Sequence, residues 1–158
     1  MFPALPFEKL NEADIREEVI APLLRLLGYQ SGTANNIIRE QSLRYPRLFL
    51  GRKDPKKDPE LRGKADYILE VGGRLRWVVE AKSPEVAIDI DAIEQAWTYS
   101  NHPEVRAIYF AVSNGRRITV FRTADGPNAG PVLSLAYEEL DAKFHVLAKR
   151  ALARGCCT

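Results

Sequence analysis

Three charged residues, Asp66, Glu80 and Lys82, lie in a stretch that otherwise has the composition of two buried strands, "KADYILEVGGRLRWVVEAKS". Burying an ionised side chain is costly unless it is paired or bound to a metal ion. Two adjacent carboxylates repel each other unless a divalent cation lies between them, and their oxygens are the hard ligands that Mg²⁺ and Mn²⁺ prefer. The pattern therefore predicts a site for Mg²⁺ (or Mn²⁺), to which the carbonyl of Ala81 could add a ligand.

Lys82 follows Glu80 by two residues, so on a strand both side chains point to the same face. An ammonium group at that place could orient or deprotonate a water molecule, or stabilise the charge of a phosphate. These residue types together are typical of a phosphodiester hydrolysis centre. The residues alone leave open the alternative of a solvated sheet face with an internal ion pair.

The register of the two strands, expected at 65–71 and 75–82, decides whether these charges meet. Alternation along the strands places one apolar set on a single face: Ala65, Tyr67, Leu69, Val71, Leu75, Trp77, Val79 and Ala81. The residues of the two strands share that face only if the numbers of each pair of opposing residues have an even sum. A plain two-residue turn at Gly72-Gly73 would give an odd sum. The sequence therefore predicts an odd-length connection or a bulge, with the three charged residues on one side.

The other elements form an alternating α/β order around this strand pair. A helix is expected from Asn11, a good N-cap, to Gly28, with Pro22 interrupting it. The further elements are a strand at 37–44, a charged loop at 46–63, a helix at 90–101, a hairpin of 105–112 and 117–123, and a helix at 135–154. A strand, a helix and a returning strand make parallel neighbours, so a central mixed β-sheet flanked by helices is expected, in two or three layers.

Composition sets the wider limits. The 158 residues suffice for one domain, 1–158, with a core at about 11–123. The formal net charge is only +2, so nucleic-acid binding would need a local patch. The segment 51–64, "GRKDPKKDPELRGK", could contact a DNA backbone or be a solvated loop.

No apolar run approaches the roughly 18 residues of a membrane span, and no signal peptide begins the sequence. Two adjacent terminal cysteines, expected to be free thiols, favour a cytoplasmic location.

The residues that carry this chemistry also carry a resemblance. Asp66 followed by Glu80-Ala81-Lys82 resembles the PD-(D/E)xK nuclease motif, although the proline of that motif is absent. Five blocks between about residues 11 and 122 resemble, in order, the N-terminal nuclease domain of type I restriction enzyme R subunits: "NEADIREEVIAPLLRLLGY", "GKADYILEV", "WVVEAKSP", "IEQAWTYS" and "AVSNGRRITVFR". The resemblance implies a restriction-endonuclease-like core with the order αβββαβ. It also implies a metal-dependent DNA endonuclease of a restriction-modification system.

The resemblance implies further site residues. Gln95 and Tyr99 match a QAxxY element that belongs to the active site in that family, and one helical turn separates them. A glutamate of the first helix commonly completes the metal site there. Helical spacing predicts a buried stripe made of Ile15, Val19, Leu23, Leu26 and Leu27. Glu12 falls near the centre of this stripe, whereas Glu17 and Glu18 point away from it. We therefore expect Glu12 in the site, with Glu18 as the alternative.

The implied partner is DNA, with methyltransferase and specificity subunits or a separate motor as further partners, and no membrane. The sequence contains no GxxxxGK[ST] element, so the chain is either a domain excised from a larger subunit or a small protein with the nuclease module alone. Two other functions stay open: a non-catalytic nucleic-acid-binding or assembly module, and a nuclease for branched or RNA substrates. No particular oligomeric state is indicated.

Overall fold

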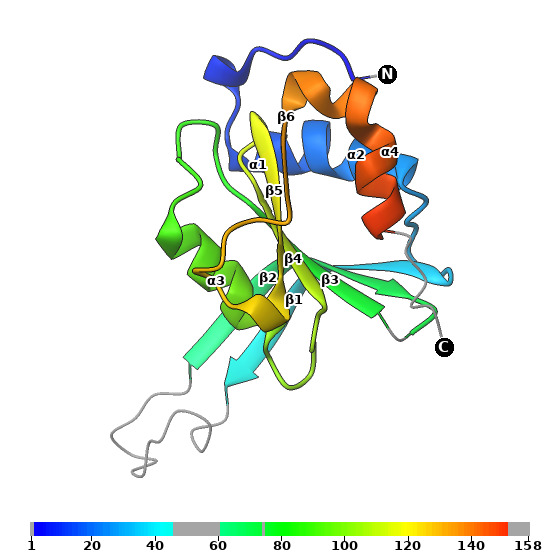
Figure 1. The fold of residues 1–158 in the computed structure, drawn as a ribbon, viewed down its shortest axis with the longest axis vertical. Coiled ribbons are helices and arrows are strands. Elements are labelled where there is room, and N and C mark those ends of the chain that lie inside the picture. The colour runs from blue at the N-terminus through cyan, green and yellow to red at the C-terminus, as the bar shows by residue number, and fades with distance from the viewer. Residues whose placement is uncertain (1, 46–60, 74, 152–158) are drawn as a thin grey trace.

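The computed structural model describes residues 2–45, 61–73 and 75–151. In the described ranges a six-stranded sheet runs in chain order: β1 (Asn35–Tyr45), β2 (Leu61–Val71), β3 (Leu75–Ala81), β4 (Tyr109–Ser113), β5 (Arg117–Arg122) and β6 (Leu133–Ala136). β3 and β4 are parallel, and every other neighbouring pair is antiparallel. The predicted mixed sheet is confirmed (Figure 1).

The helices and helical turns are η1 (Phe7–Lys9), α1 (Glu12–Ile15), η2 (Arg16–Ile20), α2 (Ala21–Leu26), α3 (Ile90–Ser100), η4 (Thr123–Asp125), η5 (Tyr137–Glu139) and α4 (Leu140–Ala151). The observed order contains the expected αβββαβ core, so the α/β prediction is confirmed. Within the described ranges, every helix is too short or too polar to span a bilayer.

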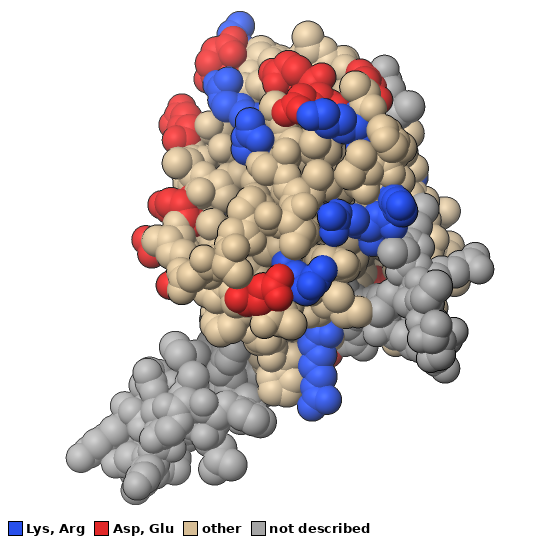
Figure 2. Space-filling view, in the orientation of Figure 1, with Lys and Arg blue, Asp and Glu red and all other residues tan. Residues whose placement is uncertain are grey.

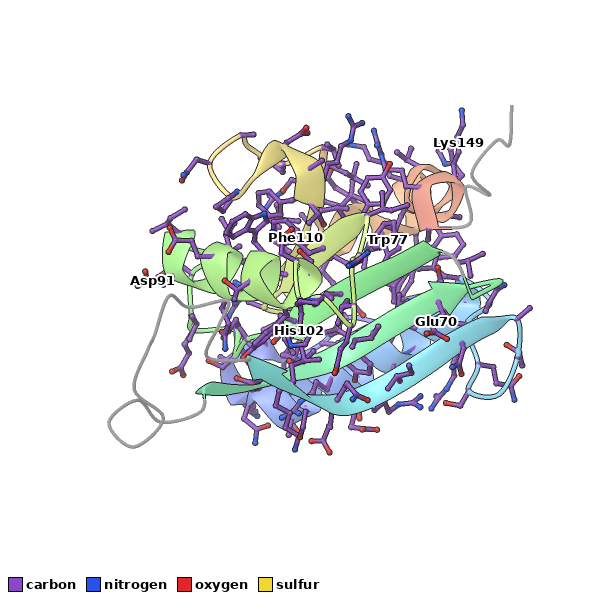
Figure 3. All side chains as sticks on the ribbon, turned by 90° about the horizontal axis from the view of Figure 1, so that it is seen from below. Glu70, Trp77, Asp91, His102, Phe110 and Lys149 are labelled. Atoms are coloured by element: carbon purple, nitrogen blue, oxygen red, sulfur yellow. The ribbon has the colours of Figure 1, made fainter. Side chains whose placement is uncertain are left out.

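The helices cover both faces of the sheet, which makes three layers (Figure 1). The first core packs the sheet against α1, η2, α2 and α4, and includes Ile15, Leu23, Leu69, Trp77, Val120 and Leu147. The second core packs it against α3, and includes Ile68, Val78, Ala96, Phe110, Val112 and Phe121. Trp77 and Phe110, labelled in Figure 3, therefore belong to opposite faces of the sheet.

The connection between β2 and β3 has the predicted odd length. Val71 pairs with Leu75, so three residues make the turn, and the opposing numbers have an even sum throughout the ladder. Gly72 and Gly73 have φ angles of 58° and 71°, a left-handed conformation that glycine adopts without a side-chain penalty. This turn places Tyr67, Leu69, Trp77 and Val79 together in the first core.

Three predicted boundaries are wrong. The strand expected from residue 105 begins only at Tyr109, because residue 105 is still in a turn in which the Val105 amide donates to the His102 carbonyl. β2 begins at Leu61, inside the segment expected as a loop; the rest of that loop, 46–60, and the terminal cysteines lie outside the described residues. The final helix was expected from residue 135, but Leu135 belongs to β6, where it pairs with Ile118 and is buried in the first core. Pairing with β5 outweighs the helical preference of this segment, and α4 begins only at Leu140.

The first helix is interrupted just before Pro22, near the place the sequence predicts. Asn11 caps α1 through its side chain, and η2 then forms a π-helical segment. The Ala21 amide donates to the Arg16 carbonyl, five residues back, where an α-helix would bond four residues back. One ideal period therefore does not describe the whole segment, and positions before η2 are rotated relative to those after it.

The predicted burial of Glu12 is wrong for this reason. Its side chain is 45% exposed, and it opens α1 as the first residue after the cap. Leu26, also assigned to the buried stripe, is exposed as well, whereas Ile15, Val19, Leu23 and Leu27 are buried as expected.

Candidate active site

Asp66 and Glu80 lie opposite each other where β2 and β3 separate. Regular pairing extends from Val71 and Leu75 to Tyr67 and Val79 and then stops. Beyond it, the Asp66 amide donates to Glu80 Oε1 at 3.1 Å, and the Ala81 amide donates to Asp66 Oδ2 at 2.8 Å. In a continued ladder, backbone amides such as these would donate to carbonyl groups of the facing strand. Here the two carboxylates accept instead, so the amides of Asp66 and Ala81 keep a hydrogen bond as the strands separate.

β3 remains attached to β4 beyond this point. Glu80 and Ala81 pair with Val112 and Ser113, and the Lys82 amide donates to the Ser113 carbonyl at 2.8 Å. The parallel partner therefore holds the chain carrying Glu80 and Lys82 rigidly, while β2 diverges from it.

The pairing of β2 with β1 is interrupted at the same level. Glu40, opposite Asp66, has a φ angle of 53°, a left-handed conformation uncommon for a residue with a side chain. Regular pairs flank this point on both sides, Arg39 with Tyr67 and Gln41 with Ala65. Irregular backbone of this kind clusters at functional sites, where the surrounding fold holds it in place.

The strand also changes face here, which corrects the predicted alternation. Tyr67 and Leu69 are in the first core as expected, but Ala65 packs in the second core beside Tyr99. Simple period-two counting therefore fails across Asp66, although it holds on the turn side of that residue.

Glu80 is a buried acid, with only 3% of its surface exposed. Burial raises the pKa of its carboxyl well above the ordinary value, and the neighbouring Asp66 carboxylate raises it further. The hydrogen bond from the Asp66 amide and the charge of Lys82 act in the opposite direction. A carboxyl in these surroundings gains from any added positive charge, such as that of a cation.

Lys82 begins a chain of hydrogen bonds that leads to α3. Its Nζ donates to Gln95 Oε1 at 2.7 Å, and Gln95 Nε2 donates to the Tyr99 hydroxyl at 3.1 Å. Asp89 caps α3 by accepting from the Ala92 amide, which fixes the start of the helix that carries Gln95 and Tyr99. Of the two residues of the QAxxY element, Gln95 thus contacts the lysine directly, and Tyr99 is linked to it through Gln95.

Arg16, from η2 of the first helix, forms an ion pair with Asp66. Its Nη1 lies 3.4 Å from Asp66 Oδ1 and 3.6 Å from Glu40 Oε1, and its Nη2 lies 3.6 Å from Glu12 Oε1. Its carbonyl accepts from the Tyr67 hydroxyl at 3.2 Å, which ties the π-helical segment to β2. Sequence analysis missed Arg16, although its position four residues after Glu12 was a usable signal for an ion pair.

A pocket of about 360 Å³ opens onto Asp66 between the first helix and β1. Its wall carries both signs of charge, from Arg16, Glu17, Arg39, Glu40 and Asp66. Helical spacing predicts that Glu17 points away from the buried stripe, yet Glu17 is the first-helix acid on this wall. Glu18 is exposed and does not line the pocket.

Glu12 is therefore not brought together with Asp66 and Glu80; Arg16 stands between them through its two ion pairs. Among the described residues, no group of three or more histidine, cysteine, aspartate or glutamate side chains is arranged to hold a metal ion. Two acids, Asp66 and Glu80, are brought together, the charge of Lys82 acts on Glu80, and Lys82 contacts Gln95.

Comparison with known proteins gives one informative likeness. No model of a known protein family matches the chain, and neither does any curated protein sequence. Among solved structures, the fold is similar to a fragment described as that of a candidate HsdR subunit of a type I restriction enzyme from Vibrio vulnificus YJ016, with a TM-score of 0.56 and 22% identity. The likeness covers 85% of this chain and 25% of that chain, so this chain corresponds to about a quarter of the solved fragment.

Proposed function

We propose that this chain is a nuclease domain of the PD-(D/E)xK type, which hydrolyses phosphodiester bonds of DNA with the help of Mg²⁺ or Mn²⁺. The observation that carries the proposal is the buried Glu80 carboxyl set against Asp66 at the point where β2 and β3 part, with Lys82 beside them. The restriction-enzyme fold of the HsdR fragment supports it. Partners such as methyltransferase and specificity subunits, or a separate motor, belong to the same proposal.

The donor set fits a hard divalent cation. Asp66 and Glu80 would hold it through carboxylate oxygens, and the carbonyl of Ala81, next to Glu80 on β3, could add a further oxygen ligand. Mg²⁺ is commonly bound through one or two carboxylates, with substrate phosphates and waters completing its shell, so a third acid is not required. A bound cation would polarise the phosphate and stabilise charge on the leaving oxygen.

The other residues act on the water and the phosphate. Lys82, with its ammonium held by Gln95, is suited to orient the attacking water or to stabilise phosphate charge. Tyr99 fixes Gln95 by accepting its amide hydrogen, so α3 sets the position of Lys82. Arg16 neutralises part of the acidic cluster before a cation binds.

The test is plasmid nicking in Mg²⁺ or Mn²⁺ by the wild-type chain and by Lys82→Ala. Because a positioned acid–base group contributes about 10²–10⁴-fold, the variant should lose at least about a hundredfold in rate. Lys149→Ala is the matched control, since Lys149 is an exposed lysine of α4 that projects from the surface in Figure 3. Equal nicking by wild type and Lys82→Ala would refute the assignment.

A second function, a non-catalytic nucleic-acid-binding or assembly module, is favoured by one observation. The Arg16 guanidinium already lies 3.4 Å from Asp66, so part of the acidic charge is balanced without any metal. Calorimetry with Mn²⁺ and a DNA gel shift separate the two functions. A chain that shifts DNA but takes up no Mn²⁺ at millimolar concentration would support the binding module.

A further inference from the structure

A second pocket, of about 550 Å³, lies beside the candidate active site at the end of α2. Its wall includes Arg25 from the last turn of α2, Gln30 and Ser31 from the following loop, and Arg39 from β1. No aspartate or glutamate is among the described residues that line it. The pocket therefore offers two positive charges, with an amide and a hydroxyl, and no competing acid.

Arg39 connects this pocket to the active site. It lines both the 550 Å³ pocket and the 360 Å³ pocket that opens onto Asp66. Its Nη1 donates to Ser31 Oγ at 3.0 Å, and Ser31 Oγ donates to the Ile37 carbonyl at 3.1 Å. The guanidinium is thus held toward the second pocket by a hydroxyl that is itself fixed by the backbone.

Neither guanidinium forms an ion pair with a described residue, in contrast to Arg16, which has three acidic neighbours. Arg25 and Arg39 are both exposed. An exposed arginine without a carboxylate partner keeps its planar fork of donors available, and this fork matches the oxygens of a phosphate.

We propose that the pocket of Arg25, Gln30, Ser31 and Arg39 binds a backbone phosphate of the DNA strand, next to the phosphate that is cut at Asp66 and Glu80. The inference rests on the proposed function and deepens it by assigning where the strand runs. The charge differs along this path: three acids and two arginines line the 360 Å³ pocket that opens onto Asp66, whereas Arg25 and Arg39 are the charged residues, among those described, that line the 550 Å³ pocket.

A local site of this kind suits the charge of the whole chain. The formal net charge is +2, and on the face drawn in Figure 2 basic residues lie among acidic and uncharged ones. Such a surface gives little general attraction for a polyanion, so discrete phosphate contacts must supply the electrostatic part of binding.

The experiment measures binding of a short labelled DNA duplex by fluorescence anisotropy, in EDTA and over a series of KCl concentrations. The proteins are the wild type, the double variant Arg25→Gln/Arg39→Gln, and the control Arg122→Gln, an exposed arginine at the end of β5. The pocket holds one phosphate, and losing that contact lowers the salt slope by about 0.9, so at about 0.1 M salt the double variant should bind about 8-fold more weakly than wild type. Arg122→Gln should keep the wild-type affinity and slope.

Three results would overturn the inference: no duplex binding by the wild type, an unchanged slope and affinity in the double variant, or an equal loss in Arg122→Gln. A competition arm adds millimolar inorganic phosphate at constant ionic strength. Free phosphate that enters the pocket should weaken wild-type duplex binding toward that of the double variant and leave the double variant unchanged; an equal loss in both proteins would contradict a phosphate site in this pocket. Thermal melting of the double variant should match wild type, because both side chains are exposed.

The nicking assay with Lys82→Ala separates this failure from failure of the proposed function. If wild type cuts, Lys82→Ala does not, and the double variant binds duplex normally, the nuclease proposal stands and the pocket inference falls. If wild type never cuts but the double variant loses duplex binding, the nuclease proposal falls, and with it the assignment of a scissile phosphate beside the pocket.

Discussion

Arg16 offers the sharpest test of the cation site, because it occupies the neighbourhood that a metal ion would need. The perturbation is Arg16→Gln, which removes the guanidinium but keeps a polar side chain of similar reach. We expect this change to tighten Mn²⁺ binding while it lowers the stability of the metal-free protein. The two effects have opposite signs, which distinguishes competition for Asp66 from simple damage to the fold.

The magnitude follows from the 3.4 Å separation of Arg16 Nη1 and Asp66 Oδ1. At that distance the Coulomb attraction is about 1 kcal/mol with the dielectric of water and about 5 kcal/mol with an effective value near 20. The side chains are 27% and 13% exposed, so the pair lies between these limits. Desolvation and side-chain entropy offset much of the attraction, which leaves a net value of about 1–2 kcal/mol.

If the guanidinium must leave Asp66 before a cation binds, this net value is subtracted from the binding free energy of the cation. Arg16→Gln should then strengthen Mn²⁺ binding about 5- to 30-fold, as 1–2 kcal/mol implies. In EDTA the same variant should lose about 2–8 °C in melting temperature, given roughly 2–4 °C per kcal/mol for a domain of this size.

Isothermal titration calorimetry with Mn²⁺ and thermal melting in EDTA measure the two effects. Arg25→Gln is the control, because it removes an exposed arginine of the next helix that has no contact with Asp66. Unchanged or weaker Mn²⁺ binding by Arg16→Gln would refute the competition. Absence of Mn²⁺ binding by every protein, wild type included, would refute the cation site itself.

Two further predictions concern the buried acid and the lysine relay. The raised pKa of Glu80 means that the folded chain favours its protonated form, so in EDTA the unfolding free energy should fall as pH rises above the ordinary carboxyl range, by about 1.4 kcal/mol per unit of pKa difference. Glu80→Gln should abolish this pH dependence and should be more stable than the wild type at pH 8 in EDTA. Mn²⁺ should stabilise only the wild type. A steeper pH dependence of the unfolding free energy in the variant, measured by urea unfolding, would contradict this. Gly63→Ala would place a Cβ 2.4 Å from Tyr99 Cε1, so the ring must shift and the bond from Gln95 breaks. We expect a loss of about 1–3 kcal/mol in stability together with slower nicking, and an unchanged nicking rate would show that the relay does not position Lys82.

The parts of the fold that follow from local rules could be predicted from the sequence. Period-two alternation fixes which faces of β2 and β3 are apolar, and that requirement alone dictates the odd-length turn that Val71 and Leu75 close. Helical spacing places Gln95 and Tyr99 one turn apart, and a parallel crossover then brings α3 over the strand that leads to Lys82. Each of these steps uses contacts within one element or between elements adjacent in the chain.

The parts that depend on distant contacts could not be predicted. Ala65 changes face at the level where β1 has a left-handed residue, Glu40, which lies 25 positions earlier, and nothing in the sequence around Ala65 signals that irregularity. Glu12 was placed on the buried stripe by assuming one helical period, but the π-helical segment before Pro22 breaks that period. β6 forms because β5 offers an edge to pair with, which outweighs the helical composition of the segment.

The irregularities are not scattered; they meet at one level of the sheet. The ladder between β2 and β3 ends at Asp66, the ladder between β1 and β2 is interrupted opposite it, and the π-helical segment presents Arg16 to the same carboxylate. A sheet selected for stability alone would continue its ladders with apolar side chains here, since both neighbouring cores are well packed. Local rules give way at functional sites, where strain and buried charge are retained for chemistry. The coincidence of three broken regularities at Asp66 is therefore an argument for a site that is independent of the motif, because none of the three was used to recognise it.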